Sequence, residues 1–261
     1  MEEAHVHDLS GYFPVLNLGS VVLPIYFLVS SLAFVLGLLF LVRRAKSCRL
    51  SRNRALDTAL VLMTTGFVGS RLFHVFFEEP AYYFEAPSRI LEIWRGGFIW
   101  YGGAVIGAIC SIAFLKWKRE PIPRYLDLFA PVGALGYAIG RFACFLTGCC
   151  YGDICFIPGA TPHDDLRFRY PTQIFAIVYE ALVLVTLLYL EKHRGNSRWL
   201  GRAGQIFIVW LILHGAGRIL MELFRGDPRG EFIFGFSIST WISGVLIAGS
   251  LGIFIKRARE T

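Results

Sequence analysis

Three arginines lie inside apolar stretches that are long enough to cross a bilayer: Arg71, Arg141 and Arg218. A guanidinium near the bilayer centre costs roughly 2.5 to 3.5 kcal/mol on insertion scales, so such a residue usually faces a bundle interior or a polar cavity. Its planar fork matches the geometry of a phosphate and never loses its charge. The three arginines therefore predict an anionic ligand within the membrane, such as the phosphate of a lipid headgroup.

Other polar residues accompany Arg218 at helical spacing. His214, Arg218 and Glu222 are each four residues apart, and Arg225 lies one turn further on. A helix would place all four on one stripe, which should face a cavity because the rest of the helix is apolar. The alternative is that the arginines pair with buried acids such as Glu180 or Glu222 and tie helices together.

A glycine-rich segment, WRGGFIWYGGAVIG, begins at residue 94 and places Gly102 and Gly103 directly after Tyr101. Glycine lets a backbone approach a ligand or another helix closely. The segment is compatible with a lining for a polar cavity. Ordinary packing of small residues between helices explains the same glycines.

The composition indicates which elements hold these residues. Of 261 residues, 55% are hydrophobic and 17% are charged, whereas soluble domains have about 25% charged residues. At about 20 residues per crossing, we expect an all-α polytopic membrane protein with seven transmembrane helices. We expect a single transmembrane domain over residues 1–261, with small extracytoplasmic loops at 78–97 and 148–170. The expected spans lie near residues 20–42, 55–77, 98–115, 125–147, 172–190, 203–223 and 235–255.

The distribution of Lys and Arg predicts the orientation. Of the 26 basic residues, 17 fall in the connections at 43–54, 116–124 and 191–202 or in the tail from residue 256. Because cytoplasmic loops carry the excess, the N terminus should be extracytoplasmic and the C terminus cytoplasmic. The net charge of +7 then reflects orientation, and we expect no nucleic-acid partner. Residues 1–19 hold no Lys or Arg, so we expect no cleavable signal peptide.

Four of the six cysteines lie within CFLTGCCYGDIC: Cys144, Cys149, Cys150 and Cys155. On an extracytoplasmic, oxidising face they should form one or two disulfides, with the pairing left open. Zinc binding is less favoured because neither a CxxC motif nor paired histidines accompany them. A redox-active or lipid-carrying cysteine is a further alternative.

Five segments in order resemble the prolipoprotein diacylglyceryl transferase family, whose members move diacylglycerol from phosphatidylglycerol to a lipobox cysteine. GSRLFHVFF resembles the family's GGRLGYVLFY, and WRGGFIWYGGAVIG resembles W-x-GG-x-x-x-HGGLIG. DLFAPVGALGYAIGRFACF resembles D-x-x-AP followed by GRxGNF. RYPTQIFAIVYE resembles an RHPSQLYE-type segment, and GAGRILMELFRGDP resembles G-x-x-R-x-x-x-E-x-x-R.

The resemblance implies roles for individual residues. It places the three membrane arginines around the lipid headgroup and matches Tyr26 to a family tyrosine. Two residue sets follow from this resemblance and from the spacing. The expected catalytic set is Arg141, Arg218, Tyr101, His74, His214 and Glu222. The expected substrate-binding set is Arg71, Tyr26, Gly102, Gly103, Cys144, Gln173, Glu180 and Arg225.

The chain departs from the family pattern at four positions, one of which is Phe27 in place of the glycine that follows the family tyrosine. Tyr101 stands where the family has the histidine of HGG, which is often assigned as the base that activates the acceptor thiol. Cys144 replaces the asparagine of GRxGNF, and Cys149 replaces a following glutamate. Phenol has a reference pKa near 10 against about 6.5 for imidazole, so Tyr101 is a poorer base. His74 or His214 could take its place.

These observations predict a transferase that moves diacylglycerol from phosphatidylglycerol to a prolipoprotein signal peptide in a bacterial inner membrane. The other partners are membrane lipids, and neither a cofactor nor a metal is expected. A relative using the same donor with a different acceptor, or a non-catalytic phospholipid-binding membrane protein, is the alternative. A transporter is less favoured because the sequence shows neither inverted repeats nor paired broken helices.

Overall fold

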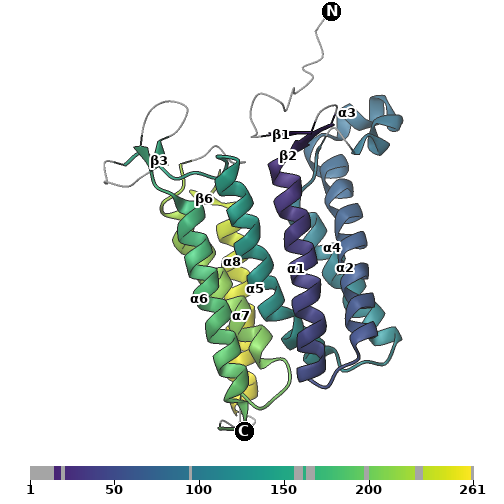
Figure 1. Ribbon diagram of the computed structural model, residues 1–261, viewed down its shortest axis with the longest axis vertical. Helices are drawn as coiled ribbons and strands as arrows, with labels where there is room; N and C mark the ends of the chain where they lie inside the picture. Colours follow the sequence, from purple (N-terminus) through teal and green to yellow (C-terminus); the bar gives the residue numbers. More distant parts are fainter. Residues whose placement is uncertain are drawn as a thin grey trace, which may run out of the picture. The chain divides into compact units, whose positions relative to one another are not determined.

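The computed structural model describes residues 15–18, 21–93, 96–155, 161–162, 168–196, 200–226 and 232–259 (Figure 1). The chain is mostly helical, and its strands form three antiparallel two-stranded hairpins. The helices are α1 (Ile25–Ser47), α2 (Arg52–Phe73), η2 (His74–Glu78), α3 (Pro80–Glu85), η3 (Pro87–Leu91), α4 (Trp100–Trp117), α5 (Ile122–Leu146), α6 (Thr172–Lys192), η5 (Arg194–Asn196), α7 (Gln205–Glu222) and α8 (Ile238–Arg259). The strands pair as β1 (Val15–Leu18) with β2 (Val21–Pro24), β3 (Thr161–Pro162) with β4 (Phe168–Arg169), and β5 (Phe232–Ile233) with β6 (Phe236–Ser237).

Seven helices in the described residues are long and apolar enough to cross a membrane, which confirms the predicted fold class. Their spans are Leu28–Ser47, Arg52–Glu78, Trp100–Trp117, Ile122–Leu146, Thr172–Lys192, Gln205–Glu222 and Ile238–Arg257. Many large apolar side chains on these helices are exposed, as expected of helices whose outer faces meet lipid. The expected loop at 78–97 contains α3 and η3, and the loop at 148–170 contains the β3–β4 hairpin.

The chain divides into two compact units. The larger unit comprises Met1–Leu39 and Leu126–Thr261, and the smaller unit comprises Phe40–Tyr125. Helix α1 contributes to both. The expectation of a single domain stays a prediction, and each unit is described by itself below.

The core of the larger unit lies among α5, α6 and α7. It consists of small and branched apolar side chains that are almost fully buried: Ala130, Ala134, Val183, Leu187, Leu200 and Ile206. Alanines on α5 allow the larger side chains of α6 and α7 to pack closely. Helix α8 packs along α7 and completes this unit.

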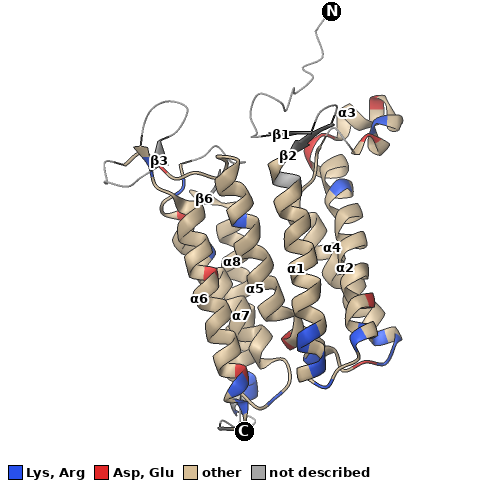
Figure 2. Cartoon of the chain, viewed as in Figure 1, with Lys and Arg blue, Asp and Glu red and all other residues tan. Residues whose placement is uncertain are grey.

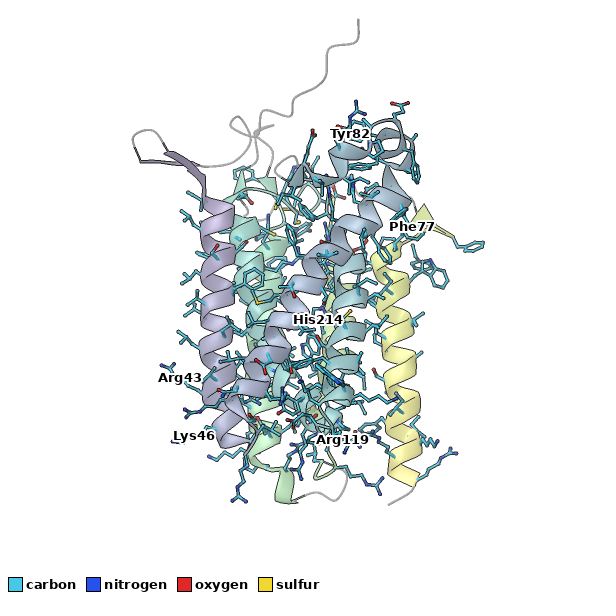
Figure 3. All side chains as sticks on the ribbon, turned by 90° about the vertical axis from the view of Figure 1, so that its right-hand side faces the viewer. Arg43, Lys46, Phe77, Tyr82, Arg119 and His214 are labelled. Carbon is cyan, nitrogen blue, oxygen red and sulfur yellow. The ribbon has the colours of Figure 1, made fainter. Side chains whose placement is uncertain are left out.

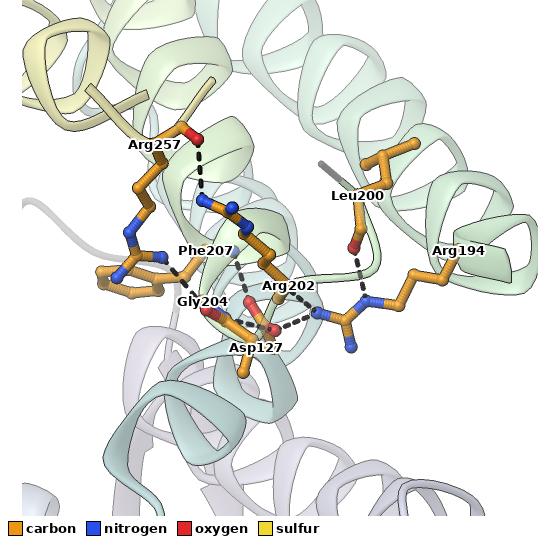
Figure 4. A network of polar contacts seen from close by, with 8 residues as sticks. Asp127, Arg194, Leu200, Arg202, Gly204, Phe207 and Arg257 are labelled. Atoms are coloured by element: carbon orange, nitrogen blue, oxygen red, sulfur yellow. Dashed lines mark hydrogen bonds and ion pairs between the residues drawn. The ribbon is translucent and has the colours of Figure 1, made fainter. Parts of the chain in front are cut away.

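A buried carboxylate near one end of the larger unit joins several segments (Figure 4). Asp127 of α5 accepts hydrogen bonds from the backbone N–H groups of Gly204, at 2.8 Å, and Phe207, at 3.0 Å, and from the guanidinium of Arg194. The first N–H groups of a helix have no partner within that helix. The Asp127 carboxylate therefore caps the N terminus of α7. It also neutralises the charge of Arg194, which follows α6.

The smaller unit is built on α2 and α4, which pack closely because glycines face each other. A Cβ atom on Gly103 would lie 2.7 Å from the carbonyl oxygen of Gly66, and one on Gly102 would lie 2.3 Å from the ring of Phe73. The helix-packing interpretation of these glycines is therefore confirmed. Their expected role in substrate binding is not supported, because the space beside them is filled by α2.

Basic side chains gather at one end of each unit (Figure 2). In the smaller unit, Arg43, Lys46 and Arg119 lie at the end opposite Tyr82 (Figure 3). In the larger unit, basic residues lie at the C-terminal ends of α6 and α8. This arrangement agrees with the predicted gathering of Lys and Arg in the connections on one side of the membrane. The direction of the termini across the membrane stays a prediction.

Candidate functional site

A small pocket opens among α5, α6 and α7 of the larger unit. One arginine from α5, one from α7 and one from the turn after α7 line it, together with a tyrosine, a thiol and a hydroxyl. The lining residues are Tyr137, Arg141, Cys150, Thr172, Ala176, Arg218, Met221 and Arg225. The pocket thus brings together Arg141, Arg218 and Arg225 of the sequence prediction.

Helical spacing explains why these side chains meet. Tyr137 and Arg141 are four residues apart on α5, and the guanidinium carbon of Arg141 lies 4.8 Å from the centre of the Tyr137 ring. Arg218 and Met221 are three residues apart on α7. Arg225 lies beyond the end of α7 and reaches the pocket through the turn that follows, so the predicted helical stripe does not extend to it. Residues three or four apart share a helix face, so each helix presents one side to the pocket.

Backbone hydrogen bonds fix the loops around the pocket. The N–H of Asp153 donates to the carbonyl oxygen of Phe224 at 2.8 Å, and the N–H of Gly152 donates to that of Tyr170 at 3.0 Å. Gly152 also forms a β-bridge with Arg225. The chain after α5, the start of α6 and the end of α7 are therefore tied together where Arg225 enters the pocket.

The turn after α5 gathers three cysteine thiols. The sulfur atoms of Cys144, Cys149 and Cys150 all lie within 4.8 Å of one another. Hydrogen bonds from the other two thiols, and then the charges of Arg141 and Arg225, hold the pKa of the Cys150 thiol below its usual range. All six cysteines of the chain are described and are free thiols. The expected disulfide is therefore wrong for this structure, although the four-cysteine segment does bring thiols together.

His214 does not reach the pocket as a free base. Its Nδ1 atom is hydrogen bonded to the Glu180 carboxylate on α6, and its ring lies 4.7 Å edge-on from that of Tyr137. The Glu180 side chain is 2% exposed, and its second oxygen has no hydrogen-bond partner among the described residues. Glu180 therefore pairs with a histidine rather than with an arginine. His214 is labelled in Figure 3 and lies in the middle of α7, away from both ends of the helix.

Two other predicted residues contact neighbouring segments. Glu222 accepts a hydrogen bond from the Ser239 hydroxyl of α8 at 3.3 Å. Gln173 donates through Nε2 to the carbonyl oxygen of Cys149 at 2.6 Å. Gln173 therefore supports the cysteine turn, and Glu222 joins α7 to α8.

Arg71 in the smaller unit has a different environment from the one predicted. Its guanidinium donates to five backbone carbonyl oxygens of the loop that follows η2, and the side chain is buried. Those acceptors belong to Arg89, Ile90, Glu92, Gly96 and Gly97. Since a guanidinium has five N–H donors, none is left for a phosphate. The predicted contact of Arg71 with the headgroup is not supported, and Arg71 holds the loop instead.

Of the remaining predicted residues, His74 and Tyr101 belong to the smaller unit and Tyr26 belongs to the larger one. His74 is hydrogen bonded through Nδ1 to the Tyr83 hydroxyl at 3.2 Å, and its Nε2 lies 3.7 Å from a carboxylate oxygen of Glu78. Tyr101 is half-buried, and its ring lies 5.3 Å from that of Trp100. Tyr26 lies in α1 by its backbone, and its side chain is outside the described part of the chain.

Sequence reasoning missed Tyr137, Cys150 and Thr172 as pocket residues. The first had a readable signal, because it precedes Arg141 by one helical turn. Cys150 belongs to the four-cysteine segment and Thr172 to the RYPTQ segment, but the sequence does not place either at the pocket, because the turn after α5 and its contact with α6 bring them there. The Thr172 hydroxyl donates to the carbonyl oxygen of Cys150 at 2.8 Å.

The arrangement of seven apolar helices and clustered arginines can be compared with known proteins. Residues 14–256 match the model of the prolipoprotein diacylglyceryl transferase family. The chain belongs to this family. Curated relatives named phosphatidylglycerol–prolipoprotein diacylglyceryl transferase include that of Parasynechococcus marenigrum, 33% identical, with 95% of each chain covered. That of Clostridium tetani is 30% identical, with 86% of this chain and 88% of the relative covered. The match to the prolipoprotein diacylglyceryl transferase family thus extends from before α1 into α8.

Proposed function

We propose that this protein transfers the diacylglyceryl group of phosphatidylglycerol to the lipobox cysteine of prolipoproteins and releases glycerol phosphate. The proposed location is the outer leaflet of a bacterial inner membrane. Family membership supports the reaction. The observation that carries the site is the pocket in which Arg141, Arg218 and Arg225 meet.

The chemistry needs positive charge where the arginines lie. The acceptor thiolate attacks the glyceryl carbon that bears the phosphate oxygen, a C–S bond forms, and the C–O bond breaks. Negative charge then grows on the departing glycerol phosphate. Fixed guanidinium groups in a site with little water stabilise that charge most in the transition state. We assign this role to Arg141 and Arg218, with Arg225 binding the same headgroup.

The surrounding residues position the arginines. Tyr137 packs against the guanidinium of Arg141, and a cation held over an aromatic ring is stabilised by the ring's electron-rich face. Glu222 anchors the end of α7 through Ser239 of α8. Gln173 and Thr172 fix the cysteine turn from the start of α6. Tyr101 remains a candidate base, and His74 and His214 are already hydrogen bonded.

A direct assay tests the proposal. Purified protein is incubated with phosphatidylglycerol labelled in its acyl chains and with a lipobox peptide, and a matched peptide carries Ser in place of the lipobox cysteine. We expect labelled peptide and one glycerol phosphate per peptide with the cysteine substrate only. Bound phosphatidylglycerol without any labelled peptide would support the non-catalytic alternative, which the replacement of the family histidine by Tyr101 keeps open.

A further inference from the structure

The three gathered thiols form a constellation that the phosphate chemistry does not use. Cys144 lies in the last turn of α5, and Cys149 and Cys150 follow the end of that helix. Their sulfur atoms lie within 4.8 Å of one another. Three thiolates bound to one tetrahedral zinc ion, with Zn–S bonds of about 2.3 Å, lie about 3.8 Å apart. The cluster therefore needs only a small contraction to hold a metal.

The backbone of the turn is specialised for this arrangement. Cys150 has φ of +59° and Gly148 has φ of +69°, a region that side-chain-bearing residues rarely adopt. Hydrogen bonds from Gln173 to the carbonyl oxygen of Cys149 and from Thr172 to that of Cys150 hold the turn in place. Residues kept in unfavourable backbone conformations cluster at binding sites. The turn thus brings together thiols that are five and six residues apart in the sequence.

We infer that Cys144, Cys149 and Cys150 form a three-thiolate site for a soft divalent cation of the zinc type, with its fourth coordination position open. Thiolate ligands select zinc over magnesium or calcium. Three thiolates and one zinc ion carry a net charge of −1, which Arg141 and Arg225 beside Cys150 balance. No fourth Cys, His, Asp or Glu of the described residues joins the group. Zinc sites with three protein ligands characteristically leave the fourth to water or substrate.

The ligand of the open position follows from the proposed function, on which this part of the inference rests. Cys150 lines the arginine pocket, so the cluster borders the place assigned to the donor lipid. The acceptor in the proposed reaction is a thiol, and a thiol that coordinates zinc is deprotonated. The acceptor cysteine would bind as a thiolate and release its proton to water at the site. A metal-bound thiolate would need no separate base, which fits a chain with Tyr101 where the family has histidine.

Metal content tests the site without reference to activity. The full-length protein is purified from zinc-supplemented cells without chelator, and zinc is measured by mass spectrometry. We expect a single zinc ion per chain, and its loss to the buffer background in Cys149→Ser and Cys150→Ser. Cys110→Ser and Cys155→Ser are matched controls that should keep the metal. Zinc at background in the parent protein, with three free thiols or with a disulfide among them, would overturn the inference.

Cobalt substitution tests the number of ligands and the open position. Apo protein loaded with Co²⁺ should show thiolate-to-cobalt charge-transfer absorption, and Cys144→Ser should reduce it. Adding a lipobox peptide should increase the absorption, whereas the matched serine peptide should leave it unchanged. If the cysteine peptide has no effect, the open position does not bind the acceptor. Transfer by zinc-free protein at the rate of the zinc-loaded protein would overturn the role of the metal in binding the acceptor and leave the proposed function standing. Bound zinc without any transfer would overturn the proposed function and leave the metal site standing.

Discussion

At the scale of single residues, the partner of each charge decides its role. Arg141, Arg218 and Arg225 line one pocket. The guanidinium of Arg71 instead donates hydrogen bonds to backbone carbonyl oxygens of its own unit. Arg71, Arg141 and Arg218 look alike in the sequence, because each lies in an apolar helix and has the same cost of insertion into the membrane. Arg71 differs from the other two because a loop folds back and offers carbonyl oxygens to its guanidinium.

Replacing Arg71 with Lys tests this distinction. A lysine ammonium has three donors and no planar fork, so it cannot hold five carbonyl oxygens. We expect faster hydrogen exchange at residues 86–93 and unchanged exchange in α7. Arg49→Lys, in the exposed turn after α1, is the control. Unchanged hydrogen exchange in the loop together with weaker binding of phosphatidylglycerol would instead indicate that Arg71 contacts the lipid.

The His214–Glu180 pair offers a second test at this scale. Glu180 is buried, and removal of its partner leaves the carboxyl group without a hydrogen bond, which typically costs about 1–3 kcal/mol. We therefore expect His214→Ala to lower the unfolding temperature in detergent. The double variant His214→Ala with Glu180→Leu should recover part of that loss, because it leaves no unpaired charge. If His214→Ala keeps full stability but loses transfer, the histidine acts in the chemistry.

At the scale of elements, glycines decide how closely α2 and α4 approach. We expect Gly103→Ala to destabilise the protein by about 1–3 kcal/mol, because its methyl group would meet the backbone carbonyl of Gly66. Gly136→Ala on α5 is the matched control, since a Cβ atom there would meet nothing within 4 Å. Chemical unfolding of the two variants in mixed micelles compares them. Equal stability would show that α2 and α4 are not held at this distance.

Periodicity predicted the helices well and their contacts poorly. The apolar spans follow from residue spacing alone, because a helix repeats every 3.6 residues. The polar stripe predicted for α7 does not face one cavity, because Arg218 lines the pocket while His214 contacts α6 and Glu222 contacts α8.

The cysteine turn does not follow from residue spacing, because Cys149 and Cys150 reach Cys144 only through two residues of positive φ. The role of Asp127 as the cap of α7 could not be predicted from spacing either, because it depends on a contact between distant segments.

At the scale of the whole molecule, the excess of basic residues predicts an extracytoplasmic N terminus. In a cysteine-free variant, a cysteine placed at the exposed position Glu85 should react with a membrane-impermeant maleimide added to intact cells. One placed at Arg49 should react only after the membrane is opened, since Arg49 lies in a predicted cytoplasmic loop. The opposite labelling pattern would invert the topology and move the arginine pocket to the inner leaflet.

The central claim is that the arginine pocket binds and activates the anionic donor. The most direct measurement is the rate of diacylglyceryl transfer by the variants Arg141→Ala and Arg218→Ala. The variants Arg141→Lys and Arg218→Lys are measured beside them, and Arg49→Ala is the control. We predict a loss of at least about a hundredfold in both Ala variants, as for a removed transition-state charge contact, weak rescue by Lys and normal transfer in the control. Normal turnover of phosphatidylglycerol by both Ala variants, with intact membrane insertion, would contradict the account.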